Sequence, residues 1–189
     1  MALWGVSDSD ESKPKYLNTA DKKNCVAKPE GWVLKKAVGS RNLEEVLVAT
    51  GGNLSVGIGA ADITEIDWIS SAFDKSAGGT LSAKVIFNEM VDVTGTPQLS
   101  VTNGNQGSGS GRGPHVLSYA SGTGTNELVF SLVIGAANAA TNADDVLSFG
   151  ANPLALNSGT IKDKGTNTAS TITSSAGIGT AAGTITVVA

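Results

Sequence analysis

The stretch "NELVFSLVI" (residues 126–134) sets the interpretation of the whole chain. Apolar side chains occupy every second position, namely Leu128, Phe130, Leu132 and Ile134. Alternate residues of an extended strand point to opposite faces of a sheet. The stretch therefore predicts a β-strand with one face in a core and the other towards solvent.

Similar short stretches recur on both sides of it, with turn signals roughly every ten residues. They are "TEIDWIS" (64–70), "LSAKVIFNE" (81–89), "PQLSVTN" (97–103), "HVLSYAS" (115–121), "DDVLSFG" (144–150), "GTIKD" (159–163), "STITS" (170–174) and "GTITVVA" (183–189). This pattern predicts an all-β fold, with an antiparallel β-sandwich over residues 61–189. A short helical turn is expected only in "GAANAATNADDV" (135–146).

Residues 1–60 differ in character from the rest of the chain. Their apolar residues come in small isolated groups without strand or helix periodicity, and a Gly-rich linker closes them at residues 50–62. We expect an extended N-terminal arm with short strands near residues 31–34 and 44–49. The arm would dock on its own body or on a neighbour, and a disordered tail is the alternative.

The three tryptophans are candidate packing or contact residues. Trp68 lies in an alternating stretch and is expected in the core. Trp4 and Trp32 lie in the arm, where burial has to come from docking. Because tryptophan is a strong anchor when buried, we expect at least one of these two at a subunit interface.

Composition and charge limit the classes of partner that the chain is expected to bind. The net charge is −4 and only 16% of residues are charged, without a basic cluster beyond two lysine pairs. Nucleic-acid binding is therefore not expected, because phosphate neutralisation needs a basic face. The start of the sequence does not resemble a secretory signal, and no apolar stretch reaches membrane-spanning length. These features favour assembly in a cytoplasm without a membrane partner.

Three motifs give the larger part of the chain a resemblance to a known family. "VIFNEMVDVTGTPQLSV" (85–101), "LSYASGTGTNELVFSLVI" (117–134) and "LALNSGTIKD" (154–163) occur in that order. Together they resemble the bacterial immunoglobulin-like repeats of large adhesins and surface proteins. The resemblance implies an immunoglobulin-like sandwich that serves as a binding or spacer module, with no catalytic residues to transfer.

A second resemblance concerns the opening of the sequence. "MALWG" (1–5) followed by "SKPKYL" (12–17) is similar to the starts of virion structural proteins of T4-like phages of marine cyanobacteria. It implies a virion protein made in the host cytoplasm, most simply a capsid decoration or accessory subunit. Its partners would be the major capsid protein, other virion subunits and copies of itself. A tail, neck or fibre subunit and a host-surface, glycan-binding module remain alternatives.

The run "GNQGSGSGRG" (104–113) looks at first like a phosphate-binding loop. A phosphate loop would end in Lys-Ser or Lys-Thr and open a helix, whereas this run precedes a predicted strand. We interpret it as a loop between two strands whose tip could touch a neighbouring subunit. Gly107 and Arg112 are its candidate contact residues. A glycan-binding site there would need clustered aromatic residues, and only Tyr119 lies nearby.

The remaining polar residues give little sign of chemistry. His115 is the sole histidine, lacks evident Ser or Asp companions and is expected at a strand edge, with a possible contact role. Asp144, Asp145 and Asp163 could meet around calcium, but they are more simply turn residues. Cys25 is the sole cysteine and is expected to be partly buried and inert. We therefore expect neither enzyme activity nor a cofactor or metal.

Overall fold

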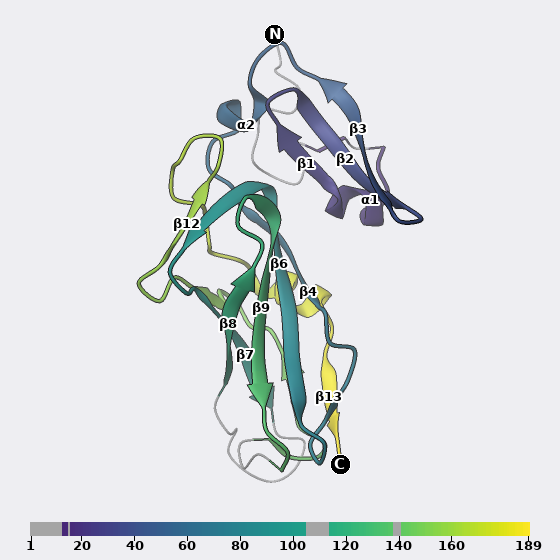
Figure 1. Cartoon of the computed structure of the whole chain (residues 1–189), viewed down its shortest axis with the longest axis vertical. Coiled ribbons are helices and arrows are strands. Elements are labelled where there is room, and N and C mark those ends of the chain that lie inside the picture. Colours follow the sequence, from purple (N-terminus) through teal and green to yellow (C-terminus); the bar gives the residue numbers. More distant parts are fainter. Residues whose placement is uncertain (1–12, 15, 105–113, 138–140) are drawn as a thin grey trace.

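The computed structural model describes residues 13–14, 16–104, 114–137 and 141–189. It consists of a small N-terminal unit above a larger body made mostly of strands (Figure 1). The all-β prediction is confirmed in this sense, since strands dominate the described residues and helices are short. Three of the predicted contact residues, Trp4, Gly107 and Arg112, lie outside the described residues.

The N-terminal unit is an antiparallel three-stranded sheet with two short helices. Its elements are α1 (Thr19–Lys23), β1 (Cys25–Lys28), β2 (Gly31–Val38), β3 (Arg41–Ala49) and α2 (Leu54–Gly57). The unit has its own apolar cluster, formed by Cys25, Ala27, Trp32, Leu34, Leu54 and Ile58. The strands expected near residues 31–34 and 44–49 fall inside β2 and β3. An extended arm is not confirmed, because the described residues form this sheet with a core.

The body contains ten strands and one helix in the described residues. They are β4 (Ile63–Trp68), β5 (Phe73–Asp74), β6 (Gly79–Thr94), β7 (Gln98–Gly104), β8 (His115–Ser121), β9 (Thr125–Ile134), β10 (Val146–Ser148), β11 (Leu154–Ala155), β12 (Thr160–Asp163), α3 (Ala176–Ala181) and β13 (Ile185–Val188). Hydrogen bonding links the strands of the whole molecule in the order β3-β2-β1-β6-β9-β8-β7-β10-β13-β5, with β4, β11 and β12 on side branches.

Two features of the body differ from the predicted fold. The sheet is mixed rather than purely antiparallel, because β13 pairs with β5 and β1 with β6 in parallel. Among the described residues of 135–146 there is no helix: turns lie at residues 136–137 and 143–144, and Val146 begins β10. The helix of the body lies instead at Ala176–Ala181, where Gly179 packs against the backbone of Phe149. That close approach depends on tertiary packing, which sequence periodicity does not report.

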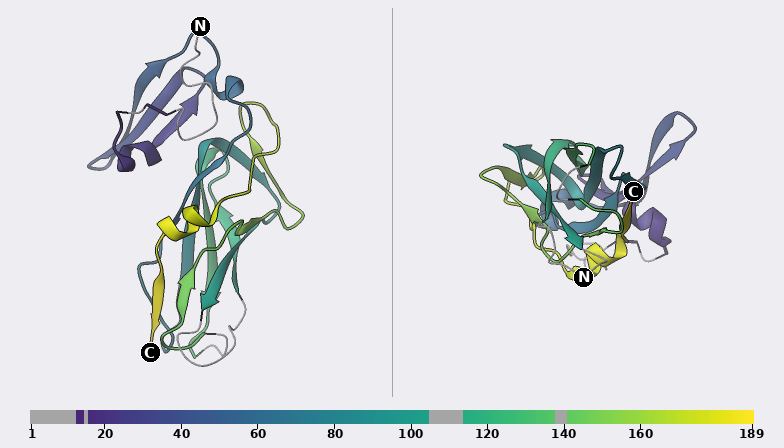
Figure 2. Two further views of the ribbon diagram at one scale, coloured as in Figure 1. Left: turned by 180° about the vertical axis from the view of Figure 1, so that it is seen from behind. Right: turned by 90° about the horizontal axis from the view of Figure 1, so that it is seen from below.

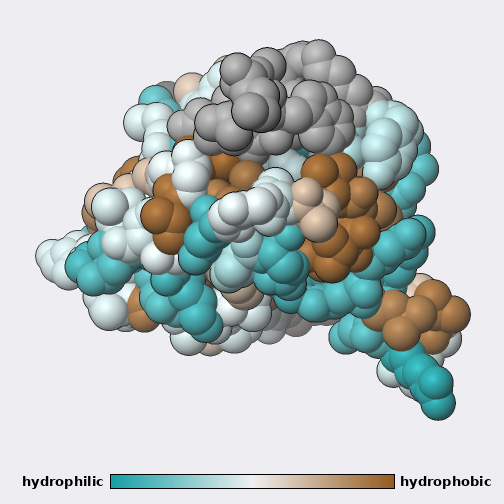
Figure 3. Space-filling model, turned by 90° about the horizontal axis from the view of Figure 1, so that it is seen from above, coloured by the Kyte–Doolittle hydropathy of each residue, from teal (hydrophilic) through white to brown (hydrophobic). Residues whose placement is uncertain are grey.

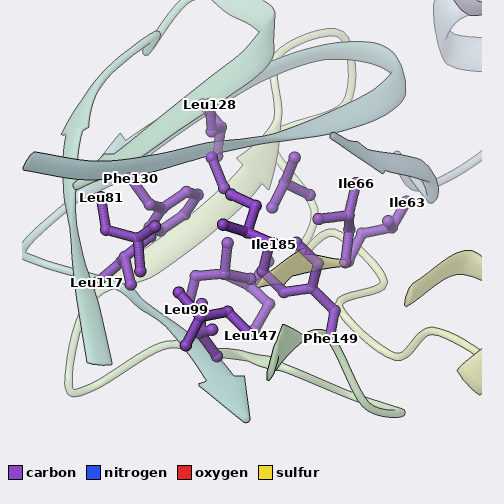
Figure 4. Close-up of a cluster of buried hydrophobic side chains, with 14 of the residues drawn as sticks. Ile63, Ile66, Leu81, Leu99, Leu117, Leu128, Phe130, Leu147, Phe149 and Ile185 are labelled. Atoms are coloured by element: carbon purple, nitrogen blue, oxygen red, sulfur yellow. The ribbon is translucent and has the colours of Figure 1, made fainter. Parts of the chain in front are cut away.

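One apolar core fills the body. Strands β6 and β9 contribute Leu81, Leu128 and Phe130, which meet side chains of β7, β10 and β13 (Figure 4). In the stretch that set the interpretation, Leu128, Phe130 and Ile134 are buried as predicted. Leu132 packs partly buried against the cluster, as does Trp68, which stacks at a tilt on Phe149 with ring centroids 4.2 Å apart.

The N-terminal unit joins the body at an irregularity in β6. Pairing of β6 with β9 is regular up to Ile86 and resumes at Val91. Between these residues Glu89 of β6 lies opposite Ala27 of β1. The interruption in the β6–β9 ladder thus coincides with the place where β1 of the N-terminal sheet pairs with β6. The two units are therefore joined by strand pairing as well as by the connecting chain.

Candidate interaction surface

The hairpin of β2 and β3 projects from the molecule. Gly39 and Ser40 connect the strands, and Gly39 has a φ of 62°. A positive φ at the first central residue is typical of a type II′ turn, which matches the twist of two antiparallel strands. The two views of Figure 2 show the hairpin leaving the rest of the ribbon. The end of the hairpin is solvent-exposed on both strands.

Strand β3 is exposed along most of its length. Its first six residues are solvent-exposed, and in the described residues it pairs with β2 alone. Three apolar side chains of the hairpin face solvent: Val38, Leu43 and Val46 are 57%, 50% and 49% exposed. The protrusion at the lower right of Figure 3 carries a hydrophobic patch beside hydrophilic residues. Exposed apolar residues on an open sheet edge are typical of an interaction surface.

Charged residues frame these apolar side chains. Lys36 Nζ lies 3.1 Å from Glu45 Oε2, and Lys28 pairs with Glu44. Arg41, at the start of β3, forms no ion pair with any described residue. Because exposed ion pairs contribute about 0–1 kcal/mol each, they do little to hold the hairpin together. Their arrangement instead places one positive charge, Arg41, and two negative charges, Glu44 and Glu45, along β3.

Two side-chain contacts hold the N-terminal unit against the body, one from the hairpin and one from α1. Lys35 Nζ donates a hydrogen bond of 2.6 Å to Oδ1 of the buried Asn126 on β9. Burial lowers the pKa of Lys35, although the carboxylates of Glu127 and Glu44 oppose the change. Beyond the hairpin, Lys23 pairs with Glu65 of β4. These contacts fix the N-terminal unit on the body, and β3 is held in place through its pairing with β2.

Trp32 lies in the interior rather than on this surface. It is fully buried in the N-terminal cluster, with its Nε1 lacking a hydrogen-bond partner among the described residues. The residue cannot contact a neighbouring subunit without unfolding that cluster. Trp32 thus packs in the core of its own unit, and because Trp4 lies outside the described residues, the expectation that one of the two tryptophans contacts a neighbour stays a prediction.

His115 is likewise buried rather than exposed. It lies on β8 opposite Val101, and its Nε2 is 3.1 Å from Thr141 Oγ1. Burial lowers the pKa of His115, and Asp145 acts in the opposite direction. The sequence interpretation missed these companions because they follow 26 or more residues later. Thr141 is fully buried, so this group cannot present a nucleophile to a substrate.

Asp145 and Asp163 both serve turns, as the simpler interpretation proposed. Asp145 accepts a hydrogen bond from the backbone N–H of Asn142, and Asp163 accepts one from Thr166, at 2.8 and 2.7 Å. Within the described residues no three His, Cys, Asp or Glu side chains gather as metal ligands would. Burial raises the pKa of the Cys25 thiol to about 11, which leaves it protonated and unreactive.

Comparison with other proteins adds no further evidence. No protein-family model, curated protein or solved structure matches the chain.

Among the described helices none has the length and apolar character to cross a membrane. The surface on the β2–β3 hairpin was not predicted as a site, although "RNLEEV" (41–46), with isolated apolar residues among charges, contained the signal.

Proposed function

We propose that this chain is a non-enzymatic structural subunit of a tailed-phage virion, a decoration or accessory protein of the capsid. It binds neighbouring virion proteins through its N-terminal unit, and residues 61–189 form an immunoglobulin-like sandwich that carries this unit. The function is protein–protein contact, repeated many times on a symmetric particle, so that weak contacts add up through effective concentration.

The observation that carries the proposal is the open β3 edge. A hairpin that leaves the body, and whose β3 edge has no second strand partner among the described residues, exposes Leu43 and Val46 and is suited to extending a neighbour's sheet. Monomeric proteins usually cover or shorten such an edge. The anchored base supports the same function, because a fixed hairpin loses less conformational freedom when it binds.

Features of the body support the immunoglobulin-like part of the proposal. The motif at residues 85–101 spans β6, β7 and the turn between them, where Gly95 has a φ of 70°. The motif at residues 117–134 forms the β8–β9 hairpin, and Gly122 and Gly124 take positive φ there. The second motif lies at a paired hairpin, as the resemblance to the adhesin repeats implies, whereas β6 and β7 of the first are consecutive strands that do not pair with each other.

The test is to determine whether the chain is part of the particle and whether β3 holds it there. Particles purified from a phage that carries the gene are analysed by quantitative mass spectrometry, with the wild-type chain, Leu43→Lys and Val133→Lys. Both replaced residues are exposed, and Val133 lies at 77% exposure on β9 away from the hairpin. We expect incorporation of the wild type and Val133→Lys, and loss of Leu43→Lys.

Two results would overturn parts of this account. Absence of the wild-type chain from purified particles refutes the virion function. Equal incorporation of all three chains keeps the virion function but removes the β3 edge as the contact.

A further inference from the structure

Strand β3 has the composition of an edge that accepts another strand. It is nine residues long, contains no proline and pairs with β2 alone in the described chain. The bulge in its ladder lies opposite Trp32 and Val33, so that residues 41–45 remain regular. None of the usual devices against edge pairing interrupts these residues, apart from their charges. The charges therefore decide which strand fits.

Symmetry limits how this strand could pair with a second copy of itself. A two-fold axis normal to a sheet makes neighbouring strands antiparallel and keeps each side chain on its own face. One residue of β3 must then lie opposite its own copy. A pairing centred on Glu44 or Glu45 places two identical carboxylates opposite each other, which is unfavourable. Centring on Val46 brings the bulge into the ladder.

A pairing centred on Leu43 is complementary throughout. Leu43 meets Leu43 of the second copy, and Arg41 lies opposite Glu45 on both sides of the axis. These three residues alternate along β3, so they share one face of the sheet. Arg41 has no ion pair within the described chain, and Glu45 has only the exposed contact with Lys36. The pairing thus gives Arg41 an ion-pair partner and buries the exposed side chain of Leu43.

We propose that two copies of this chain join edge to edge through β3, antiparallel and centred on Leu43, with Arg41 of each copy paired to Glu45 of the other. The inference deepens the proposed function and rests on it for the setting in which the contact operates. It joins the two N-terminal sheets into one continuous sheet. Because the contact is isologous, it closes as a dimer and does not grow into a filament.

The size of the contact sets its expected strength. Residues 41–45 give only five facing pairs of residues. Stable protein–protein interfaces bury roughly 1,200 Å² or more, which takes about 20–30 residues on each side. The isolated chain should therefore dimerise weakly and reversibly. On a particle, where copies are held close together, the same contact gains from effective concentration. A weak dimer in solution and a firm one on the particle are both expected.

Disulfide trapping tests the register directly. In the proposed pairing the two Cα atoms of residue 43 are about 4.5–5.5 Å apart, which is within reach of a disulfide. Those of residue 45 are more than about 10 Å apart. The native Cys25 is fully buried and does not interfere. Under mild oxidation we expect Leu43→Cys to give a covalent dimer on a non-reducing gel and Glu45→Cys to remain monomeric.

A charge exchange provides an independent test. Arg41→Glu and Glu45→Arg each bring like charges together, and we expect each to abolish the concentration-dependent dimer seen by sedimentation. The double variant restores the unlike pairs and should recover it. Circular dichroism checks that all variants stay folded. We expect them to, because residues 41, 43 and 45 are exposed and contribute little to the core.

The proposal is overturned if Leu43→Cys gives no covalent dimer, if Glu45→Cys gives one equally well, or if the double variant stays monomeric. If the chain stays monomeric in every one of these tests but is present in particles, the β3 edge would bind a different virion protein and not a second copy. A chain that dimerises but is absent from particles would refute the proposed function and leave this inference standing.

Discussion

At the scale of single residues, Trp32 is the main determinant of the N-terminal unit. Its side chain is fully buried, yet its Nε1 lacks a hydrogen-bond partner among the described residues. The residue therefore stabilises by filling volume, while its N–H contributes a penalty. The N-terminal cluster is small, so that loss of this one side chain removes a large part of it.

We predict that Trp32→Ala lowers the free energy of unfolding by about 3–5 kcal/mol, the usual range for a buried aromatic residue. Trp32→Phe should cost clearly less, because it keeps most of the volume and removes the unpaired N–H. Urea denaturation followed by circular dichroism measures both. Equal losses for the two variants would show that the indole N–H has a partner that matters.

His115 makes stability depend on pH. Burial holds its pKa in the folded chain below its ordinary value of 6.5. Below that value the unfolded chain binds a proton that the folded chain does not, so stability falls as the pH drops through 6.5 towards the lower folded pKa. Below the folded pKa the contribution of His115 levels off.

We predict that His115→Gln removes this component. Unfolding free energies of the wild type and the variant, measured from neutral to mildly acidic pH, should differ by an amount that shrinks as the pH falls. A constant difference across that range would contradict the buried, neutral histidine.

At the scale of elements, glycines fix the hairpin turns of the body. Gly122, in the turn between β8 and β9, has a φ of 116°, and a Cβ there would lie 2.0 Å from the backbone oxygen of Glu127. No other residue fits without moving a strand. Gly57 of α2 is the opposite case, since a Cβ there meets nothing within 4 Å.

We predict that Gly122→Ala destabilises the chain by about 1–3 kcal/mol or more, because it combines backbone strain with a steric clash. Gly57→Ala should stabilise it by about 0.4–1 kcal/mol through loss of freedom in the unfolded chain. Thermal unfolding of the two variants compares them directly. If both variants change the free energy of unfolding in the same direction, the predicted difference between Gly122 and Gly57 is wrong.

The elements also show how far sequence reasoning reaches. Strands with regular alternation, such as β6 and β9, were predicted because their pattern directly reflects a half-buried position. The N-terminal sheet was predicted only as fragments, because β3 is exposed on both faces and leaves no alternation to detect. Parallel pairing of β13 with β5 and the contact of His115 with Thr141 join distant segments, which local patterns do not encode.

At the scale of the whole molecule, the attachment of the N-terminal unit is the feature that matters for function. The parallel contact of β1 with β6 and the hydrogen bond from Lys35 to Asn126 hold it to the body. If this attachment loosens, the β3 edge loses its fixed direction, and a symmetric contact becomes harder to form.

We predict that Lys35→Met speeds hydrogen exchange in β1 and β2 while β9 keeps its protection, because the buried Oδ1 of Asn126 loses its partner. Lys36→Met is the matched control, since Lys36 is exposed and its ion pair contributes little. Similar exchange in the two variants would show that the attachment does not depend on Lys35.

The measurement that tests the central claim most directly is hydrogen exchange along β3, in the isolated chain and in the assembled particle. The isolated chain should protect β1 and β2 but leave those β3 amides that point away from β2 to exchange rapidly. Assembly should protect these same amides and change β9 little. Unchanged rapid exchange of β3 in the particle would contradict the account, because the open edge would then have no role in assembly.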